Sequence, residues 1–580
     1  MRNIFIAFCI AAVMVSSCMG PKDGTYSLTL LTTNDVHGTF FDSTYVGGNV
    51  KKSLYSVKYV IDSVRAAQGA ENVILVDAGD IVQGDNAAYY YNYVDTITPH
   101  VYPRMAKYMG YDAVVLGNHD IEAGHPVYDR LARDLKALNI PLLAGNAFRN
   151  DNGQRYFPYL TMLKRQGLKI AILGYDNANI AGWLPERLWS GMTFENLVPL
   201  VRQDVEAVIQ KEKPHIVIVA VHSATGSGDG SQLESQGLDL MKSIPGVDFL
   251  VCSHDHRPKV VTSDTLCLIN SGSHSRYVGH GNITFTVKKG KVTDKKLQAD
   301  LIPVDARKKD QEMAKVFRDD YLAVKAFTTK KVGELKTDLV TRDAYKGMCP
   351  YLNLIHTLSL SCSPAEISLA APLTFNGTVK SGDIIYNDLF TIYPFENQLY
   401  VINMTGKEIK DYLEASYDGW INTYPGAAHV LKIDSRDDPR NGQKSWSFVN
   451  RSYNFDSAGG LVYTVDVTKP YGSRINIESM AGGDPFDLGR TYKVAATSYR
   501  ASGGGGLMAK AGVDTGKIEE RVEATYPEIR EILYEYLKKN NAIDPVLISD
   551  PARIGSWKFV PEAVAEPALE KDMDLLFGRR

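Results

Sequence analysis

The sequence has 580 residues, a formal net charge of -3 and 44% hydrophobic residues. A single hydrophobic core rarely serves more than about 250–300 residues, so we expect the chain to fold as two domains. The small net charge and the absence of a basic run argue against a nucleic-acid polymer as the principal partner, whereas a single nucleotide is compatible with this composition.

The amino terminus has the pattern of an export signal. Met1-Arg2-Asn3 is a short basic stretch, residues 4–15 form an apolar run too short to span a bilayer, and Ser16-Ser17-Cys18 has the small residues of a cleavage site. Its end is similar to a bacterial lipobox, which predicts a lipid-modified Cys18 and a soluble body tethered to a membrane of the cell envelope, in the periplasm or on the surface. The alternative is an ordinary signal peptide that contains a cysteine.

Five apolar, extended-looking runs in the first half of the chain each lead into a short polar loop. The runs are residues 28–31, 73–76, 113–116, 216–221 and 249–251. Strands buried on both faces read as continuous apolar runs, and ligands gather at the carboxyl ends of parallel strands. We therefore expect the five loops to meet at one place. Their polar residues are Asp35, His37, Asp80, Asn118, His119, His222, His254 and His256.

These side chains suit two divalent metal ions. Imidazole favours zinc and its neighbours, while carboxylate and amide oxygens extend the choice towards manganese or calcium. Two ions about 3.5–4 Å apart need a bridging carboxylate and can clamp both oxygens of an in-line displacement. Asp80 is the candidate bridge. The alternative is a structural metal site, but such a site would not need the extra imidazole of His119, and cysteine would be a more usual ligand.

The metal-bearing half is expected to end after a β-hairpin that turns at Lys289-Gly290. A charged stretch from Arg307 to Lys325 follows, with apolar residues at roughly helical spacing. We interpret it as an interdomain connector, and an ordinary surface helix of either domain is the alternative. The expected divisions are a signal peptide at 1–18, a first domain at 19–305, a connector helix at 306–330, a second domain at 331–545 and a tail at 546–580.

Four cysteines lie outside the signal, at Cys252, Cys267, Cys349 and Cys362. One or two disulfides are compatible with an oxidising envelope, but the spacing does not give the pairing.

The second half has no comparable set of metal ligands, so we expect it to bind the substrate. Two aromatic loops are the candidates: Tyr453 and Phe455 precede a Gly-Gly pair, and Tyr499 precedes the glycines at 503–506. Aromatic rings can stack on a nucleobase, which contributes about 1–3 kcal/mol per base. The glycine run lets the backbone approach a ligand closely.

The order Asp-x-His, Gly-Asp, Gly-Asn-His-Asp, a lone His and His-x-His resembles that of the calcineurin-type metallophosphoesterases. The spacing and the long second half are similar to the bacterial periplasmic nucleotidases, which include 5'-nucleotidase/UDP-sugar hydrolase and 2',3'-cyclic-nucleotide 2'-phosphodiesterase/3'-nucleotidase. The resemblance extends from the export signal to about residue 540. It implies an α/β fold, in which a calcineurin-like metallophosphoesterase domain (a β-sandwich flanked by helices) precedes an α+β 5'-nucleotidase-type C-terminal domain.

The resemblance also implies roles for the loop residues. His119 matches the family's catalytic histidine. In the 5'-nucleotidase branch an Asp three residues later orients this histidine. Here that position is Glu122, and Asp120 follows the histidine directly, so either carboxylate is a candidate. One metal ion would be held by Asp35, His37, Asp80 and His256, and the other by Asp80, Asn118, His222 and His254.

In the second half, Tyr499 matches a base-stacking aromatic residue of the family, with Tyr453 or Phe455 as its partner. The 5'-nucleotidase branch typically carries a Gly-Gly-x-Arg segment, but residues 368–375 read Ser-Leu-Ala-Ala-Pro-Leu-Thr-Phe and lack arginine. The sequence of this segment is more similar to that of the cyclic-nucleotide branch.

The expected function is metal-dependent hydrolysis of 2',3'-cyclic nucleotides and 3'-nucleotides to nucleoside and phosphate, by a lipid-anchored monomer. The first alternative is a 5'-nucleotidase/UDP-sugar hydrolase. Two further classes stay open: a hydrolase of other esters on the same scaffold, and a catalytically silent binding lipoprotein. Retention of every metal-ligand type together with His119 argues against the silent class.

Overall fold

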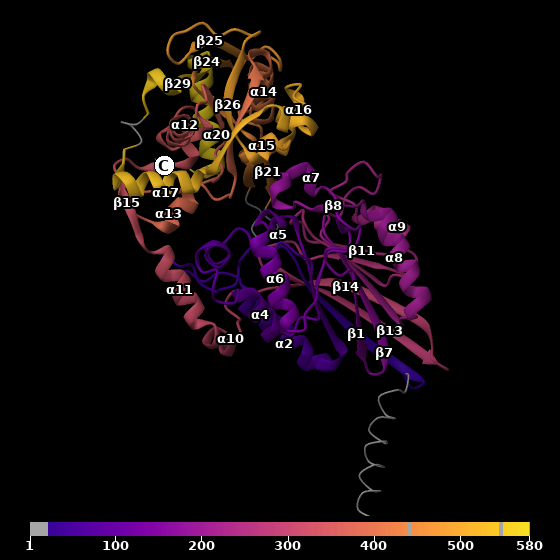
Figure 1. The fold of residues 1–580 in the computed structure, drawn as a ribbon. Helices are drawn as coiled ribbons and strands as arrows, with labels where there is room; N and C mark the ends of the chain where they lie inside the picture. The colour runs from indigo at the N-terminus through magenta and orange to yellow at the C-terminus, as the bar shows by residue number, and fades with distance from the viewer. Residues whose placement is uncertain (1–20, 438–443, 545–548, 579–580) are drawn as a thin grey trace, which may run out of the picture. The chain divides into compact units, whose positions relative to one another are not determined.

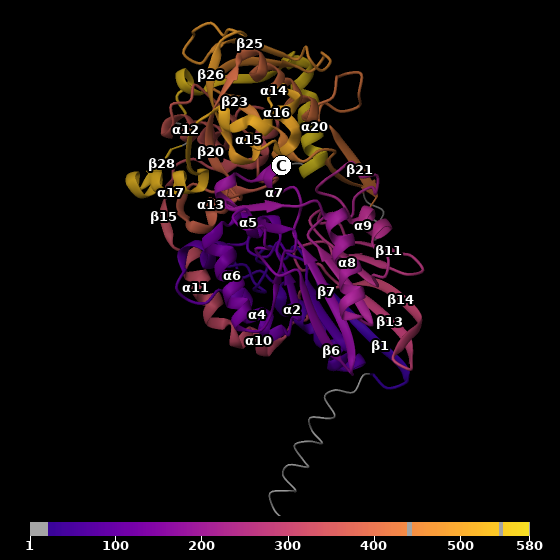
Figure 2. The same ribbon diagram turned by 45° about the vertical axis from the view of Figure 1, so that its right-hand side comes forward.

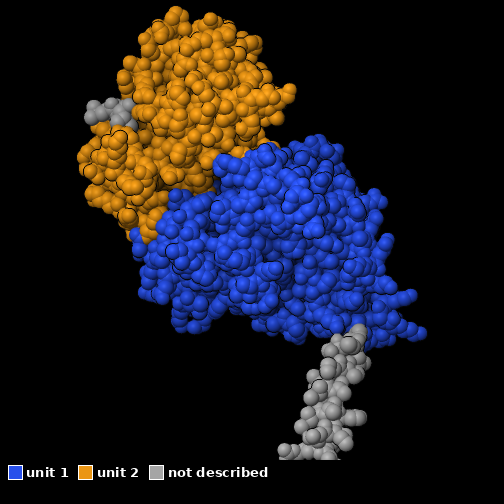
Figure 3. All heavy atoms as spheres, viewed as in Figure 1, with its two compact units in different colours: residues 1–181, 186–326 blue, residues 182–185, 327–580 orange. Residues whose placement is uncertain are grey.

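The computed structural model describes residues 21–437, 444–544 and 549–578, and its fold is drawn in Figure 1. The chain divides into two compact units, which Figure 3 colours separately. Unit 1 comprises residues 21–181 and 186–326 of the described chain, and unit 2 comprises residues 182–185 and the described residues from 327 onwards. The predicted export signal and Cys18 lie outside the described residues.

Unit 1 is built on two six-stranded sheets. The first contains, in spatial order, β14 (Lys291–Pro303), β13 (Tyr277–Lys288), β1 (Gly24–Thr33), β2 (Val73–Asp77), β3 (Ala113–Val115) and β4 (Leu142–Leu143). The second contains β11 (Lys259–Thr262), β12 (Cys267–Asn270), β10 (Phe249–Cys252), β9 (Ile216–Val221), β7 (Leu168–Tyr175) and β6 (Leu160–Arg165). Strands β1 to β4 are parallel to one another, as are β7, β9, β10 and β12.

One apolar core contains side chains from both sheets. It includes Leu30, Val76 and Val115 from the first sheet and Ile218 and Val251 from the second. A second core lies on the other face of the second sheet, against α8 (Leu197–Glu212) and α9 (Gly237–Ser243). This arrangement confirms the expected helix-flanked β-sandwich. It also explains why the five runs read as continuously apolar, because both faces of the central strands are buried.

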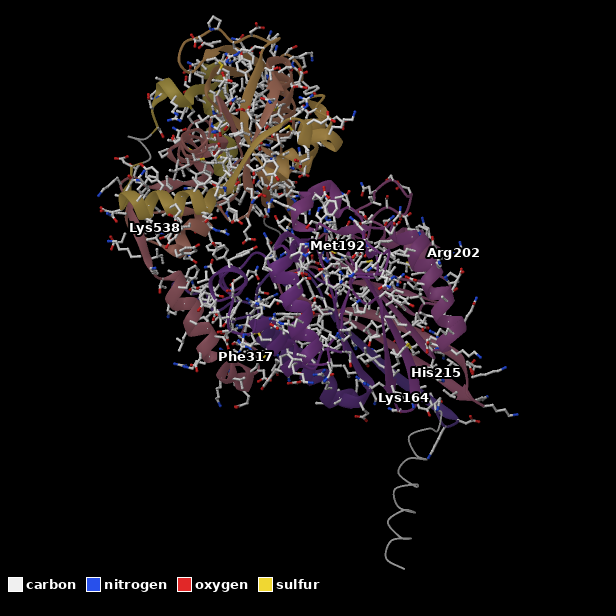
Figure 4. The ribbon with its side chains drawn as sticks, in the orientation of Figure 1. Lys164, Met192, Arg202, His215, Phe317 and Lys538 are labelled. Carbon is white, nitrogen blue, oxygen red and sulfur yellow. The ribbon has the colours of Figure 1, made fainter. Side chains whose placement is uncertain are left out.

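Helices flank the two sheets on opposite sides, as Figure 1 and Figure 2 show. Helices α2 (Leu54–Gln68), α4 (Val101–Met109) and α6 (His125–Ala137) lie on the side of the first sheet, and α8 and α9 on the side of the second. Leu197, Val201, Val205 and Val208 recur at helical spacing and are the buried face of α8. Arg202 projects from the opposite face of this helix (Figure 4).

The expected hairpin is confirmed, since β13 pairs with β14 through Lys288 and Lys291. The charged stretch that follows forms α10 (Gln311–Val316) and α11 (Arg318–Thr328). The stretch from Arg307 to Lys325 belongs to unit 1, and the division between the units falls between Ala326 and Phe327, near the end of α11.

Unit 2 has a five-stranded sheet in the order β23 (Ser457–Gly459), β17 (Ile367–Ala370), β26 (Thr491–Thr497), β20 (Gln398–Thr405) and β27 (Val522–Glu528). Helices α12 (Pro350–Cys362), α14 (Gly406–Trp420) and α17 (Ile529–Asn540) contact this sheet. A single large core joins α14, β20, β24 (Leu461–Asp466) and β26.

The described part of the predicted tail is an integral part of unit 2. Strand β29 (Gly555–Val560) pairs in parallel with β24, and α20 (Glu562–Phe577) follows it. Trp557, Phe559 and Leu569 are buried in the core of unit 2. Cys252, Cys267, Cys349 and Cys362, all within the described chain, are free thiols.

Candidate metal centre and substrate-binding residues

The carboxyl ends of five strands in unit 1 bring the predicted ligands together. The loop after β1 carries Asp35 and His37, and the loop after β2 carries Asp80. Strand β3 leads into the short helix α5 (Asn118–Glu122), His222 directly follows β9, and β10 leads into the loop of His254 and His256. Three strand ends come from the first sheet and two from the second, so the site lies where the edges of both sheets meet.

The first cluster consists of Asp35, His37, Asp80 and His256, whose ligand atoms all lie within 4.8 Å of one another. Nε2 of His37 lies 2.9 Å from Nε2 of His256, and His256 Nε2 lies 3.5 Å from Oδ1 of Asp35. The Nδ1 atom of His37 faces the carbonyl oxygen of Gln83 at 3.0 Å, so Nδ1 carries the hydrogen. The His37 Nε2 lone pair is therefore directed into the cluster.

The second cluster consists of Asp80, His222 and His254. Oδ1 of Asn118 lies 3.1 Å from Nε2 of His222 and 2.9 Å from Nδ1 of His254, so this amide oxygen belongs to the same group. His222 Nδ1 donates to the carbonyl of Ala78 at 2.8 Å, which directs its Nε2 atom inward. Asp80 is common to both clusters, as a bridging carboxylate must be.

Five of these side chains are held by left-handed backbone. Each such residue costs of the order of 1–3 kcal/mol unless its surroundings enforce it, and such residues concentrate at functional sites. The φ angles are 49° at Asp35, 46° at His37, 58° at Asp80, 73° at His254 and 59° at His256.

Two glycines allow the loops to approach one another. A Cβ on Gly117 would lie 2.4 Å from the backbone nitrogen of Asp80, and a Cβ on Gly79 would lie 2.9 Å from Nδ1 of His222. Neither position can accept a side chain without moving the ligands.

Two further aspartates support the loops from behind. Asp120 accepts hydrogen bonds from the backbone nitrogens of Asp80, Gly117, Ile81 and Val82 at 2.8–3.1 Å. Asp77 accepts one from Thr33 Oγ1 at 2.5 Å and one from the Gly79 nitrogen at 3.0 Å. Both carboxylates therefore hold backbone in place. Asp120, predicted as a possible partner of the His119 ring, is occupied by these amides instead.

Glu122 is the carboxylate that contacts His119. Its Oε2 atom lies 2.5 Å from Nδ1 of the imidazole, and the backbone nitrogen of His119 donates to Oδ1 of Asp80 at 2.9 Å. Burial alone would lower the pKa of His119, but the negative charges of Asp80 and Glu122 outweigh it and raise the pKa to about 9. His119 therefore carries a proton at neutral pH, beside the two clusters.

The electrostatics of the clusters favour bound cations. Burial lowers the pKa of His254 to about 3 and that of His256 to about 4, so both imidazoles are neutral and able to ligate. Burial raises the pKa of Asp35 to about 8. Oδ2 of Asp80 is buried and accepts no well-aligned hydrogen bond from the described residues. Nε2 of His222 lies 3.1 Å from this oxygen but is not aligned for a hydrogen bond. A buried carboxylate oxygen without a well-aligned hydrogen bond is costly, and a cation would satisfy it. The donor set therefore fits two divalent ions.

In unit 2, the predicted aromatic residues have different surroundings. Tyr453 and Tyr499 are half-buried, and their ring centroids lie 6.5 Å apart with the rings nearly perpendicular. Phe455 is completely buried and stacks on Trp420 at 5.5 Å within the core. The prediction that Phe455 could stack on a substrate is wrong, because no face of its ring is accessible.

Phe395 is an aromatic residue of this group that the sequence analysis missed. It is half-buried and lies 6.3 Å from Tyr453, in edge contact. Its loop has no Gly-Gly pair, which was the signal used to select the other two loops. Phe395, Tyr453 and Tyr499 together form the aromatic group of unit 2.

Comparison with known proteins identifies both units. Residues 28–258 match the family model described as calcineurin-like phosphoesterase, and residues 326–511 match the model described as 5'-nucleotidase, C-terminal domain. The chain therefore combines these two domains, as the sequence implied, and it is a phosphoester hydrolase.

Individual relatives are distant. UshA of Escherichia coli is 25% identical over 93% of this chain and 95% of its own length. The trifunctional nucleotide phosphoesterase YfkN of Bacillus subtilis is 23% identical over 95% of this chain, which spans only 41% of that protein.

Among solved structures, a putative 5'-nucleotidase from Staphylococcus aureus superimposes with a TM-score of 0.74 at 20% identity, covering 92% of this chain and all of that one. A 5'-nucleotidase precursor from Thermus thermophilus gives a TM-score of 0.60 at 20% identity, covering 93% of this chain and 100% of the other. These matches show the shared fold.

Proposed function

We propose that the chain is a dinuclear metal-dependent nucleotide phosphohydrolase. The observation that carries this proposal is the pair of ligand clusters that share Asp80, with His119, whose ring contacts Glu122, beside them. The first ion would be held by Asp35, His37, Asp80 and His256, and the second by Asp80, Asn118, His222 and His254. Two divalent ions, zinc, manganese or similar, would supply Lewis acidity towards water and phosphoryl oxygens.

The residues of the chain supply the remaining requirements. His119 is placed to neutralise negative charge on the phosphoryl group or the leaving oxygen, because its ring is charged and Glu122 fixes its orientation. Asp120 and Asp77 keep the loops in place through their hydrogen bonds to backbone amides. The nucleobase would stack on the aromatic group of Phe395, Tyr453 and Tyr499.

For regiochemistry, we propose 2',3'-cyclic nucleotides and 3'-nucleotides as the preferred substrates. Two arginines beside the aromatic group are committed to protein contacts, which supports this choice. Arg500 pairs with Asp456, and Arg530 pairs with Glu396 and donates to the carbonyls of Tyr393 and Pro394. Residues 368–375 contain no arginine. A phosphate on the ribose 2',3' edge does not need an arginine clamp built for a 5'-phosphate.

A 5'-nucleotidase is the second candidate, favoured by the names of relatives such as the 5'-nucleotidase of Vibrio vulnificus, which is 24% identical over 90% of this chain. Phosphate release from 2',3'-cyclic AMP, 3'-AMP, 5'-AMP and UDP-glucose by the metal-loaded protein separates the two. Higher kcat/KM for the first two substrates supports the proposal. Higher kcat/KM for 5'-AMP would replace it with the second candidate.

We further propose that the enzyme is exported and anchored through a lipid on Cys18. Among the described residues, no helix combines the length and apolarity needed to cross a membrane. If the lipid on Cys18 is the anchor, Cys18→Ser should release the protein from the membrane fraction of the cells that express it. Retention of the Cys18→Ser protein in washed membranes would exclude this anchor.

A further inference from the structure

The guanidinium group of Arg500 lies beside the aromatic group. Every one of its N–H donors has a hydrogen-bond acceptor in the protein. Nε and Nη2 donate to the two oxygens of Asp456 at 2.9 and 2.7 Å. Nη2 also donates to the Tyr453 carbonyl at 2.5 Å, and Nη1 donates to Oδ1 of Asn454 at 2.9 Å and to the Gly504 carbonyl at 3.0 Å. Five N–H groups thus have five acceptors.

Asp456 connects this guanidinium to the core. Its Oδ2 atom also accepts a hydrogen bond from the hydroxyl of Tyr412 at 2.5 Å, and its carbonyl accepts one from Ser416 Oγ at 2.8 Å. Both of these residues lie on α14. Arg500 and Asp456 are only 3% and 1% exposed, so the pair is almost completely removed from water. We call Tyr412, Asn454, Asp456 and Arg500 the Arg500 network.

The network contacts both aromatic loops directly. It binds the carbonyl of Tyr453 itself, and it binds the carbonyl of Gly504, whose backbone packs against the ring of Tyr499. A Cβ on Gly504 would lie 2.3 Å from that ring. The guanidinium carbon also lies 5.2 Å from the centroid of the Tyr499 ring. One side chain therefore fixes the positions of two rings that belong to separate loops.

Stability alone does not account for such a pair. A buried ion pair can usually be replaced by apolar residues of similar volume without loss of stability, because desolvation offsets its attraction. What an apolar residue cannot provide is a planar set of donors that joins two loops. Lysine cannot provide it either, since it has three donors on a flexible stem.

We propose that Arg500 is a positioning residue, which holds Tyr453 and Tyr499 in the arrangement that stacks on the nucleobase. This inference rests on the proposed function, because it assumes that the aromatic group binds a base. It predicts a role in substrate affinity for a residue that does not touch the substrate.

The test compares a nucleotide with a substrate that has no base. KM and kcat are measured for the nucleotide that the wild-type protein hydrolyses fastest, and kcat/KM for bis(4-nitrophenyl) phosphate. Arg500→Lys should raise KM for the nucleotide by about 10-fold, within the range expected for a lost stacking contact. It should change kcat/KM for the chromogenic ester by less than about twofold. Asp456→Asn should act in the same direction and serves if Arg500→Lys does not fold.

Two further variants separate positioning from general damage. Arg474 is also 3% exposed but donates to the carbonyls of Tyr417 and Ile421, outside the aromatic loops. Arg474→Lys should leave the ratio of the two activities unchanged. Because Arg500 acts through both rings, adding Arg500→Lys to the variant Tyr453→Ala/Tyr499→Ala should change its KM by less than about twofold.

The outcomes are distinguishable. If Tyr499→Ala raises KM for the nucleotide but Arg500→Lys and Asp456→Asn do not, the positioning role is wrong and the base site stands. Equal losses on both substrates in Arg500→Lys would also contradict positioning, as would an Arg500→Lys effect on KM that persists when Tyr453 and Tyr499 are both alanine. If Tyr499→Ala leaves KM unchanged, the proposed base site itself fails.

Discussion

At the scale of single residues, the charge and contacts of a few buried side chains decide what the site can do. Asp80 and Asp77 are three residues apart and equally buried, yet their surroundings differ. Asp80 belongs to both ligand clusters, while Asp77 binds Thr33 and the Gly79 amide. Residue type and burial are matched, so the contacts distinguish the two carboxylates.

Replacing Asp80 should destroy the centre. Removing a residue that only supports a metal ligand typically costs 10- to 100-fold in activity or metal affinity. Because Asp80 is assigned as a ligand itself, we expect Asp80→Ala to lose more than about 10²-fold in kcat, together with at least one bound ion. Asp77→Asn is the matched control. It should retain two ions per chain and lose mainly thermal stability. Metal analysis of both purified variants makes the comparison, and an active Asp80→Ala protein with two ions would refute the bridge.

His119 should act through its proton. We expect His119→Ala to keep both ions and to lose roughly 10²–10⁴-fold in kcat, the range for one acid–base group. The negative charge of Glu122 raises the pKa of this ring, so wild-type activity should fall at alkaline pH as His119 loses its proton.

Glu122 tests the same assignment through the pH profile. Glu122→Gln removes a negative charge that raises the pKa of His119, so the alkaline limb of the kcat/KM profile should move to lower pH. If the alkaline limb does not move, a group other than His119 titrates there.

Metal analysis of the His119→Ala protein provides a separate check. Loss of metal from this variant would make His119 a ligand.

The aromatic residues that are accessible to a substrate were harder to predict from the sequence than the metal-cluster residues. The loop motifs placed the metal-cluster residues correctly in space, because each motif follows a recognisable strand. The aromatic residues did not follow from pattern alone. Phe455 and Tyr453 are neighbours in one loop, and only the tertiary packing against Trp420 turns the first into the core and leaves the second accessible.

At the scale of elements, the strands and turns that depend on local sequence were predicted correctly. The five apolar strands and the hairpin turning at Lys289-Gly290 form as expected. The residues after Pro545 had no assigned role, because their partners are distant in sequence. Strand β29 pairs with β24, in which Leu461 lies opposite Gly555. No periodicity within the tail could reveal this pairing.

Helix α20 should stabilise unit 2 through one buried carboxylate. Asp572 is 1% exposed, and it contacts Nδ1 of His429 at 2.6 Å and accepts from the Leu431 nitrogen at 2.9 Å. Asp572→Ala leaves both groups without this acceptor, so we expect a loss of about 2–4 kcal/mol in the free energy of unfolding.

The control lies on the same helix. Glu570 is 64% exposed and pairs with Lys346, so Glu570→Ala should change the unfolding free energy by less than about 0.5 kcal/mol. Denaturant unfolding followed by tryptophan fluorescence measures both variants, since Trp420, Trp446 and Trp557 all belong to unit 2. Equal midpoints for the two variants would show that the carboxylate of Asp572 has no such role.

At the scale of the whole molecule, each unit has a core of its own. The sandwich core contains only residues of unit 1, and the core around α14 contains only residues of unit 2. The length of the chain predicted this division into two. The positions of the apolar runs could not give its boundary, because α10 and α11 are equally compatible with a connector and with a helix of either domain.

Metal binding should therefore stabilise one unit selectively. A ligand that binds only the folded state at 100 times its Kd contributes about 2.7 kcal/mol. Calorimetry of the metal-loaded protein and of the chelated protein should show a lower melting temperature for unit 1 after chelation and an unchanged one for unit 2. A shift of the unit 2 transition alone would place the ions elsewhere.

We propose above that the five loops of unit 1 form a two-metal centre that hydrolyses nucleotide phosphoesters. The most direct measurement is phosphate release from the nucleotide panel, with the metal content of the same sample determined in parallel. We expect two divalent ions per chain, turnover that disappears when a chelator removes them, and recovery when zinc or manganese is returned. Undiminished nucleotide hydrolysis by the metal-free protein would contradict it, as would a two-metal protein that releases phosphate from none of the nucleotides.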